Sequence, residues 1–148
     1  MSIRMHLFKM IALSSVALVA GLVVTGCGPA PTPTPASVRV TLDEWSVKPS
    51  VASVPAGKVT FQVVNQGKIE HELVLLKTDL AANALKARAA EPDKVDEEAG
   101  AKNMGEIEDV GTGASKSETF DLAPGKYVLV CNVAGHYKSG MATAFEVK

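Results

Sequence analysis

Residues 127–148, YVLVCNVAGHYKSGMATAFEVK, hold two apolar segments separated by a polar loop. The first segment, 127–131, is a continuous apolar run typical of a buried strand, and the second, 141–148, alternates apolar and polar residues. The loop carries three soft or borderline metal ligands, each separated from the next by four residues. They are Cys131, His136 and Met141. Because Gly135 and Gly140 allow the loop to turn tightly, both ends can face inward.

The strand pattern recurs along the chain. Period-2 alternation, or a short apolar run bounded by turn residues, predicts seven strands. These are residues 37–45, 59–65, 71–77, 105–110, 117–122, 127–131 and 141–148. Prolines and a glycine predict turns over residues 47–58, and the alanine-rich residues 79–90, with Asp79 as a cap, predict a short helix. Six to eight short strands with one helical insertion indicate an all-β sandwich or barrel.

Large aromatic side chains are scarce. Aromatic residues make up 5% of the chain, so valine, leucine and alanine must supply most of the core. We expect the few large rings to lie in the core rather than on a binding surface. They are Trp45, Phe61, Phe120, Tyr127 and Phe145.

Residues 1–26 have the layout of a secretory signal, with a short basic region before an apolar run at residues 10–24. The run is short for a membrane span of roughly 20 residues. It ends in VVTGC, which resembles a bacterial lipoprotein signal and implies cleavage before Cys27 and lipidation of its thiol. The alternative is an ordinary leader cut nearby, which would leave Cys27 a free thiol.

The Pro/Thr-rich residues 27–36 predict an extended linker after the leader. A disulfide between Cys27 and Cys131 is conceivable in an exported protein. We favour separate roles, because a disulfide from an extended linker to a strand end would be unusual. The expected product is an exported domain, residues 37–148, lipid-anchored to the outer face of the cell membrane or in the periplasm.

Charge argues against nucleic acid as a partner. The chain has 15 Lys and Arg against 16 Asp and Glu, with no concentration of basic residues typical of a nucleic-acid surface. Acidic residues gather between positions 91 and 109. We interpret them as a solvated loop.

Few nitrogen or sulfur ligands remain once His6 leaves with the leader. Apart from the predicted anchor Cys27, they are His71, Met104, Cys131, His136 and Met141. Each alone would most often be structural. Together, two imidazoles, a thiolate and a thioether are the ligand set of a blue-copper site, whereas structural zinc sites use Cys and His. We therefore predict one copper ion bound by His71, Cys131, His136 and Met141, and we take Met104, in a polar loop, as incidental.

EHELVLLKTD at 70–79 and PGKYVLVCNVAGHYKSGM at 124–141 together resemble the cupredoxins, the plastocyanin- and azurin-like blue copper proteins. The Cys-x4-His-x4-Met loop and the lipoprotein leader look most like auracyanin and the sulfocyanin-like members. The resemblance implies a Greek-key sandwich, three strong copper ligands with Met141 axial, and single-electron shuttling between larger redox partners. It also implies that electrons leave through His136.

Weaker assignments accompany the resemblance. Asn65 resembles an asparagine often found ahead of the first ligand, although a turn-forming role is an equal alternative. The carbonyl of Glu70 is a candidate distant axial contact. Tyr137, beside His136, is expected at the surface near the exposed edge of that ligand. Residues 79–113 are longer than the matching region of the smallest plastocyanins, which leaves the partner surface undefined.

The predicted function is electron transfer by a membrane-tethered type 1 copper protein that cycles between Cu(II) and Cu(I). One alternative is a copper carrier or storage protein, but such proteins tend to be rich in Met or His. Another is a metal-free adhesion or assembly module. An enzyme is not expected, because a single type 1 centre has no open position for a small-molecule substrate.

Overall fold

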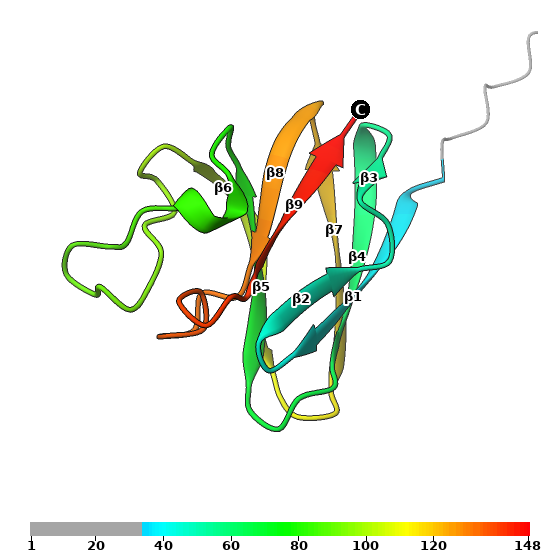
Figure 1. Ribbon diagram of the computed structural model, residues 1–148. Helices are drawn as coiled ribbons and strands as arrows, with labels where there is room; N and C mark the ends of the chain where they lie inside the picture. The colour runs from blue at the N-terminus through cyan, green and yellow to red at the C-terminus, as the bar shows by residue number, and fades with distance from the viewer. Residues whose placement is uncertain (1–33) are drawn as a thin grey trace, which may run out of the picture. The chain divides into compact units, whose positions relative to one another are not determined.

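The computed structural model describes residues 34–148, which form two β-sheets (Figure 1). The strands are β1 (Ala36–Asp43), β2 (Ser46–Pro49), β3 (Ser53–Val54), β4 (Gly57–Asn65), β5 (His71–Lys77), β6 (Lys102–Val110), β7 (Ser115–Leu122), β8 (Gly125–Val130) and β9 (Ala142–Val147). A single 3-10 turn, η1 (Ala82–Ala84), is the helical element within this part of the chain. No helix among residues 34–148 is long and apolar enough to cross a membrane. The predicted leader, Cys27 and the linker as far as residue 33 lie outside the described residues.

Strands that are distant in the sequence pair side by side. The first sheet has the order β2-β1-β4-β7 and the second has the order β3-β9-β8-β5-β6. β1 pairs parallel with β4, and β3 with β9, while the other neighbouring strands run antiparallel. Such crossovers between two packed sheets are those of a Greek-key sandwich. The all-β fold class predicted from the sequence is confirmed.

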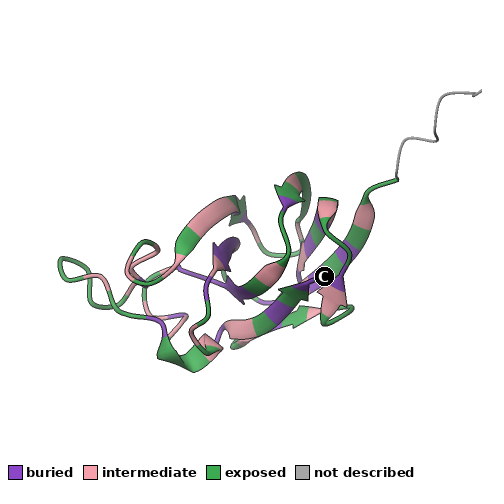
Figure 2. Ribbon diagram, turned by 90° about the horizontal axis from the view of Figure 1, so that it is seen from above, coloured by how far each residue is buried: buried purple, intermediate pink, exposed green. Residues whose placement is uncertain are grey.

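The main core lies between the two sheets, and Figure 2 shows its buried residues alternating with exposed ones along the strands. In β1, Val38, Val40 and Leu42 are fully buried, whereas Arg39 between them is exposed. This is the alternation predicted for residues 37–45. Each such side chain contributes about 1.5–3 kcal/mol through the hydrophobic effect.

The second sheet is covered on both faces. In β5, Leu73 and Leu75 point into the main core, while Val74 and Leu76 belong to a second hydrophobic cluster on the opposite face. This cluster also contains Leu85, Val95, Val128 and Val130. The segment between β5 and β6 therefore covers the outer face of the sheet. Burial on both faces explains why β5 and β8 are continuous apolar runs rather than alternating ones.

The helix predicted for residues 79–90 is wrong. Only η1 forms, and the backbone is extended on both sides of it, at Ala81 and at Leu85. The Leu80 N–H donates to the Thr78 hydroxyl at 3.1 Å, and Leu85 is buried against the second sheet. Tertiary packing thus outweighs the helix propensity of alanine, which is a weak preference in so short a segment.

Two short strands occur where only turns were predicted. β2 pairs with β1, and β3 pairs with the last two residues of β9. Both lie at sheet edges. An edge strand can be short and can end in a proline, as β2 does at Pro49, so alternation carries little signal there.

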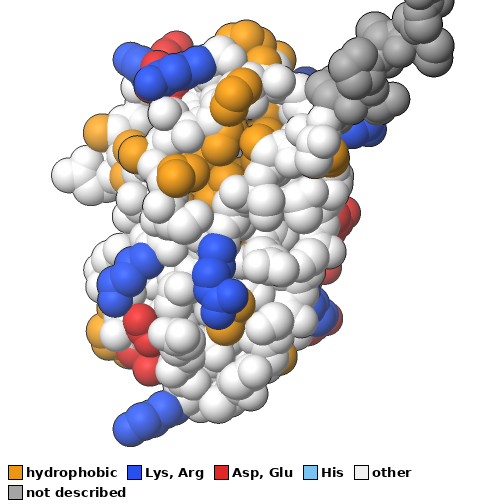
Figure 3. Space-filling view, turned by 90° about the vertical axis from the view of Figure 1, so that its right-hand side faces the viewer, with side chains coloured by type: hydrophobic (Ala, Val, Ile, Leu, Met, Phe, Trp, Pro, Cys, Tyr) orange, Lys and Arg blue, Asp and Glu red, His pale blue; other side chains and the backbone are white. Residues whose placement is uncertain are grey.

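One side of the domain is shown as a surface in Figure 3, where hydrophobic side chains gather in the upper half and charged side chains of both signs stand around them. Across the described residues, the large hydrophobic side chains that remain exposed are Trp45, Val51 and Ile69. Single exposed apolar residues are normal on a protein surface. Trp45 is an exception because its ring contacts that of His136.

Candidate metal centre

Three predicted ligands come together from separate elements. His71 begins β5, Cys131 directly follows β8, and His136 lies in the loop between β8 and β9. All three are buried, and their ligand atoms lie within 4.8 Å of one another. The second sheet places β5 beside β8, so a residue at the start of one strand meets a residue at the end of its antiparallel neighbour.

The three ligand atoms form a compact triangle. Cys131 Sγ lies 3.2 Å from His136 Nδ1 and 3.7 Å from His71 Nδ1, and the two Nδ1 atoms are 3.2 Å apart. Atoms bound to one first-row metal ion at about 2.0–2.3 Å lie roughly 3.3–3.8 Å from each other. The triangle therefore has the size to hold a single ion, and both imidazoles present Nδ1 to it.

Burial sets the protonation of two ligands. It raises the pKa of the Cys131 thiol to about 11, against a smaller lowering by the Glu72 N–H. It also lowers the pKa of His136, assisted by the nearby His71. In the metal-free protein near pH 7 the thiol is protonated and His136 is neutral. A metal ion must displace the thiol proton when it binds.

The Cys131 sulfur accepts a backbone hydrogen bond from the N–H of Glu72 at 3.4 Å, and the backbone of Val133 also acts on it. Such bonds withdraw charge from a ligand sulfur and tune a blue-copper site. The sequence does not point to Glu72. Its contribution comes from the backbone and leaves no residue-type signal.

Met141 is fully buried and lies next to Cys131 at the base of the loop. The Cys131 N–H donates to the Met141 carbonyl at 3.0 Å, and Val130 pairs with Ala142 in the β8–β9 ladder. The competing thioether, Met104, is partly buried in β6 and packs against the main core. This contact gives Met104 a packing role.

Asn65 is buried at the end of β4 and joins three backbone groups. Its Nδ2 donates to the carbonyls of Ile69 at 2.7 Å and Val110 at 2.8 Å, and its Oδ1 accepts from the Gly67 N–H at 2.8 Å. These bonds shape the loop that leads into His71. Glu70 is exposed in the same loop, and its carbonyl contact stays a prediction.

The segment between β5 and β6 fastens the ligand loop at three points. Asn132 pairs with the N–H and carbonyl of Val95 at 2.5 and 3.1 Å. The Gly135 N–H donates to the Asp93 carbonyl at 2.8 Å. The Leu85 N–H donates to the Tyr137 hydroxyl at 3.0 Å. The sequence offered no signal for these partners, because they depend on how the segment between β5 and β6 packs against the ligand loop.

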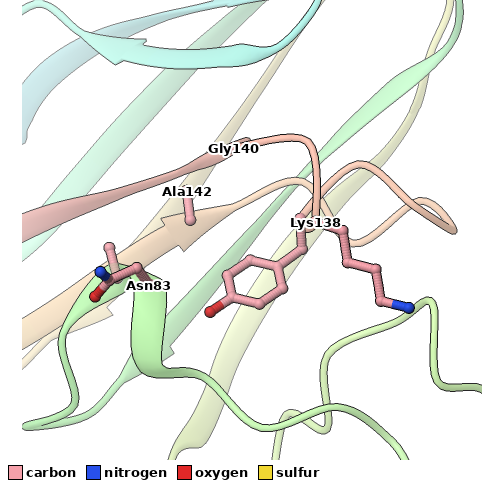
Figure 4. Close-up of a pocket in the computed structure, with 6 residues that line it drawn as sticks. Asn83, Lys138, Gly140 and Ala142 are labelled. Carbon is pink, nitrogen blue, oxygen red and sulfur yellow. The ribbon is translucent and has the colours of Figure 1, made fainter.

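Tyr137, predicted at the surface near the edge of His136, is partly buried. It packs against the second hydrophobic cluster and lines a surface pocket of about 420 Å³ between η1 and the ligand loop (Figure 4). Asn83 and Lys138 also line this pocket. The side chain therefore ties the loop to the insertion.

The turn between β1 and β2 covers both imidazoles. Trp45, predicted to be a core residue, is 48% exposed, and its ring contacts His136 edge-on with centroids 5.4 Å apart. His136 itself is only 6% exposed. Glu44 precedes Trp45, and its Oε1 lies 3.5 Å from His71 Nε2. Neither contact was predicted, because the turn is far from the ligands in sequence.

Comparison with known proteins identifies the family of this chain. Residues 46–147 match the sulfocyanin (SoxE) domain family. No curated protein matches the sequence. Among solved structures, auracyanin from Roseiflexus castenholzii is 21% identical, with a TM-score of 0.57 over 78% of this chain and 99% of its own. Auracyanin B is 28% identical, with a TM-score of 0.55 over 79% and 92%.

A third solved structure, auracyanin A, described as a "blue" copper protein from Chloroflexus aurantiacus, is 19% identical, with a TM-score of 0.52 over 78% and 100%. These likenesses agree with the two-sheet fold, and the family match spans most of the described residues. The buried His71, Cys131 and His136, with Met141 beside them, supply the ligand set of a type 1 copper site. The chain belongs to the sulfocyanin (SoxE) domain family and is a cupredoxin with a blue copper site.

Proposed function

We propose that this protein carries single electrons between larger redox partners, with one type 1 copper ion that alternates between Cu(II) and Cu(I). The observation that carries the proposal is the buried triangle of His71, Cys131 and His136. When bound, copper supplies the one-electron chemistry, and the chain supplies the ligands. Because four protein ligands fill the site, we propose no substrate chemistry.

The chain supports electron transfer by holding the ligands still. The Met141 N–H donates to the His136 carbonyl at 3.2 Å, and the Cys131 N–H donates to the Met141 carbonyl. Three ligands are thus linked through the backbone of one loop. A site that changes little between oxidation states needs little rearrangement when an electron enters or leaves, whether or not its geometry is strained.

We place the electron exit at His136 and the ring that covers it. His136 is the ligand in the surface loop, and the exposed Trp45 ring contacts it. A redox partner that reaches this region would approach Trp45 before it reached the imidazole.

Redox cycling of copper-loaded protein tests the proposal. A one-electron inorganic oxidant and reductant should interconvert the two states repeatedly, with one electron per copper and no loss of metal. A copper carrier would instead release the ion to a Cu(I) chelator after reduction. A metal-free module would retain less than one copper per chain. Either of these results would contradict the proposal.

We also propose that the domain is exported and tethered to a membrane through lipidated Cys27. The support is the sequence alone: the leader at 1–26, the VVTGC motif and the Pro/Thr-rich linker. One acyl chain binds a membrane only marginally, so stable anchoring needs the full lipoprotein modification. Cys27→Ala should move the protein from the membrane fraction to the soluble fraction without changing its copper site. An unchanged distribution would contradict the tether.

A further inference from the structure

We propose that Glu44 is a positioning residue of the copper centre. Its carboxylate accepts a hydrogen bond from the Nε2–H of His71 and thereby favours the Cu(II) state. This inference rests on the proposed electron-transfer function. It adds a charged partner outside the four ligands, supplied by the turn between β1 and β2.

The first evidence is the environment of His71. Its side chain is fully buried, and its Nε2 atom has no hydrogen-bond partner within 3.5 Å of suitable geometry. Its Nδ1 atom faces Cys131 Sγ and His136 Nδ1. When Nδ1 binds a metal, the remaining proton of the neutral ring must sit on Nε2. A buried N–H of this kind requires an acceptor.

Glu44 Oε1 is in place to be that acceptor. It lies 3.5 Å from His71 Nε2, a few tenths of an ångström beyond the usual range of about 2.7–3.2 Å for such a bond. Metal-ligating histidines commonly donate their second N–H to a carboxylate, which fixes the tautomer and makes the metal-bound nitrogen more basic.

The Glu44 carboxylate is itself held in position. Its Oε1 accepts the backbone N–H of Lys68 at 2.6 Å and that of Ile69 at 3.1 Å. These two bonds join the β1–β2 turn to the loop that leads into His71. A glutamate side chain is anionic at neutral pH, so these bonds hold a negative charge beside His71.

Gly67 provides the space for this arrangement. A Cβ at Gly67 would meet the Glu44 carboxylate, with Cδ only 2.9 Å away. Any larger residue would push the carboxylate away from Lys68, Ile69 and His71. Glycine at this position therefore lets the carboxylate lie directly against the backbone of the loop.

A negative charge at this position should act on the copper potential. It stabilises Cu(II) more than Cu(I), because the attraction grows with the charge of the ion. Hydrogen bonding from Nε2 acts in the same direction by strengthening Nδ1 as a donor. Removal of the charge should therefore raise the reduction potential.

The experiment compares three copper-loaded full-length proteins: wild type, Glu44→Gln and Asp43→Asn. Glutamine keeps an oxygen that can accept from Lys68 and Ile69 but removes the charge. Asp43 is the matched control, because it loses the same charge one residue away while pairing with the exposed Lys48 at 3.2 Å. The measurement is the ratio of Cu(II) to Cu(I) in equilibrium with a redox couple of known potential, at fixed pH and salt.

For Glu44→Gln we expect the Cu(II) to Cu(I) ratio to fall about tenfold, equivalent to a potential about 59 mV higher. For Asp43→Asn we expect less than about a twofold change, because that carboxylate pairs with Lys48 and not with a copper ligand. A Glu44→Gln ratio within twofold of the Asp43→Asn ratio would overturn the inference. If wild-type protein with copper is not blue, the proposed function fails instead, which separates the two outcomes.

A second measurement covers the case in which Glu44→Gln does not fold. In wild-type protein reduced to Cu(I), the proton on His71 Nε2 should be visible by NMR as a downfield, slowly exchanging signal. Rapid exchange of this proton with water would show that it lacks an acceptor and would overturn the inference.

Discussion

Cys131 combines two properties that oppose each other in the metal-free protein. Its sulfur must be a thiolate to bind copper, but burial raises the pKa of the thiol to about 11. Only the N–H of Glu72, at 3.4 Å, and the backbone of Val133 favour the charged form. The metal ion therefore supplies the charge that makes the thiolate stable, and copper binding is coupled to release of the thiol proton.

This coupling predicts how copper affinity depends on pH. Because the bound form lacks the thiol proton, affinity should rise about tenfold per pH unit between pH 7 and 9. His136 adds no further proton in this range, since its pKa is lowered and it is already neutral. Competition with a chelator of known affinity measures the slope. A plateau near pH 8.5, the pKa of an ordinary thiol, would contradict the buried thiol described here.

Trp45 is the residue whose role the sequence predicted least well. A tryptophan is usually buried, yet this one is half exposed and lies over His136. Trp45→Ala should let solvent reach His136 and speed removal of copper by a chelator several-fold. Val51→Ala, which truncates another exposed hydrophobic residue, is the control. Equal extraction rates in the two variants would show that Trp45 does not shield the ligand.

At the scale of elements, the segment between β5 and β6 supports the ligand loop from outside. Its contacts include Asn132 with Val95, the Gly135 N–H with the Asp93 carbonyl, and Tyr137 with Leu85. Lys138 also pairs with the Asp93 carboxylate at 2.6 Å. Through these contacts the segment between β5 and β6 helps to hold the ligand loop in position.

The Asn132 contact should be measurable as stability. Asn132→Ala leaves the buried N–H of Val95 without its partner, so we expect the free energy of unfolding to fall by about 1–3 kcal/mol. Asn83→Ala, an exposed change in η1, should stay within about 0.5 kcal/mol. Urea unfolding of the copper-free proteins makes the comparison. A similar loss in both variants would mean that the hydrogen bonds between Asn132 and Val95 contribute little to stability.

The strands were easier to predict than their connections. Period-2 alternation marks β1 because one face is buried and the other is wet. The apolar run of β5 signals burial but cannot say what covers each face, and its outer cover, Leu85 and Val95, belongs to the segment predicted as helix and solvated loop. Local propensity failed there because nonlocal packing decides the backbone.

At the scale of the whole molecule, the β-sandwich brings residues that are far apart in the sequence into one metal site. The antiparallel pairing of β5 and β8 brings the start of one strand beside the end of the other, so His71 meets Cys131 and His136. The ligands were predictable because the ability of Cys, His and Met to bind copper follows from the residue type alone. Glu44, Glu72 and Asn132 were not, because their roles arise from contacts that exist only in the folded chain.

The visible absorption spectrum of oxidised, copper-loaded protein tests the central claim most directly. If His71, Cys131 and His136 hold one copper ion in a type 1 site, wild-type protein should be intensely coloured by charge transfer from the Cys131 sulfur. Cys131→Ser should lose this band, whereas Met104→Leu should keep it. A colourless wild-type protein that retains one Cu(II) per chain, or a Cys131→Ser variant that is as blue as wild type, would contradict the account.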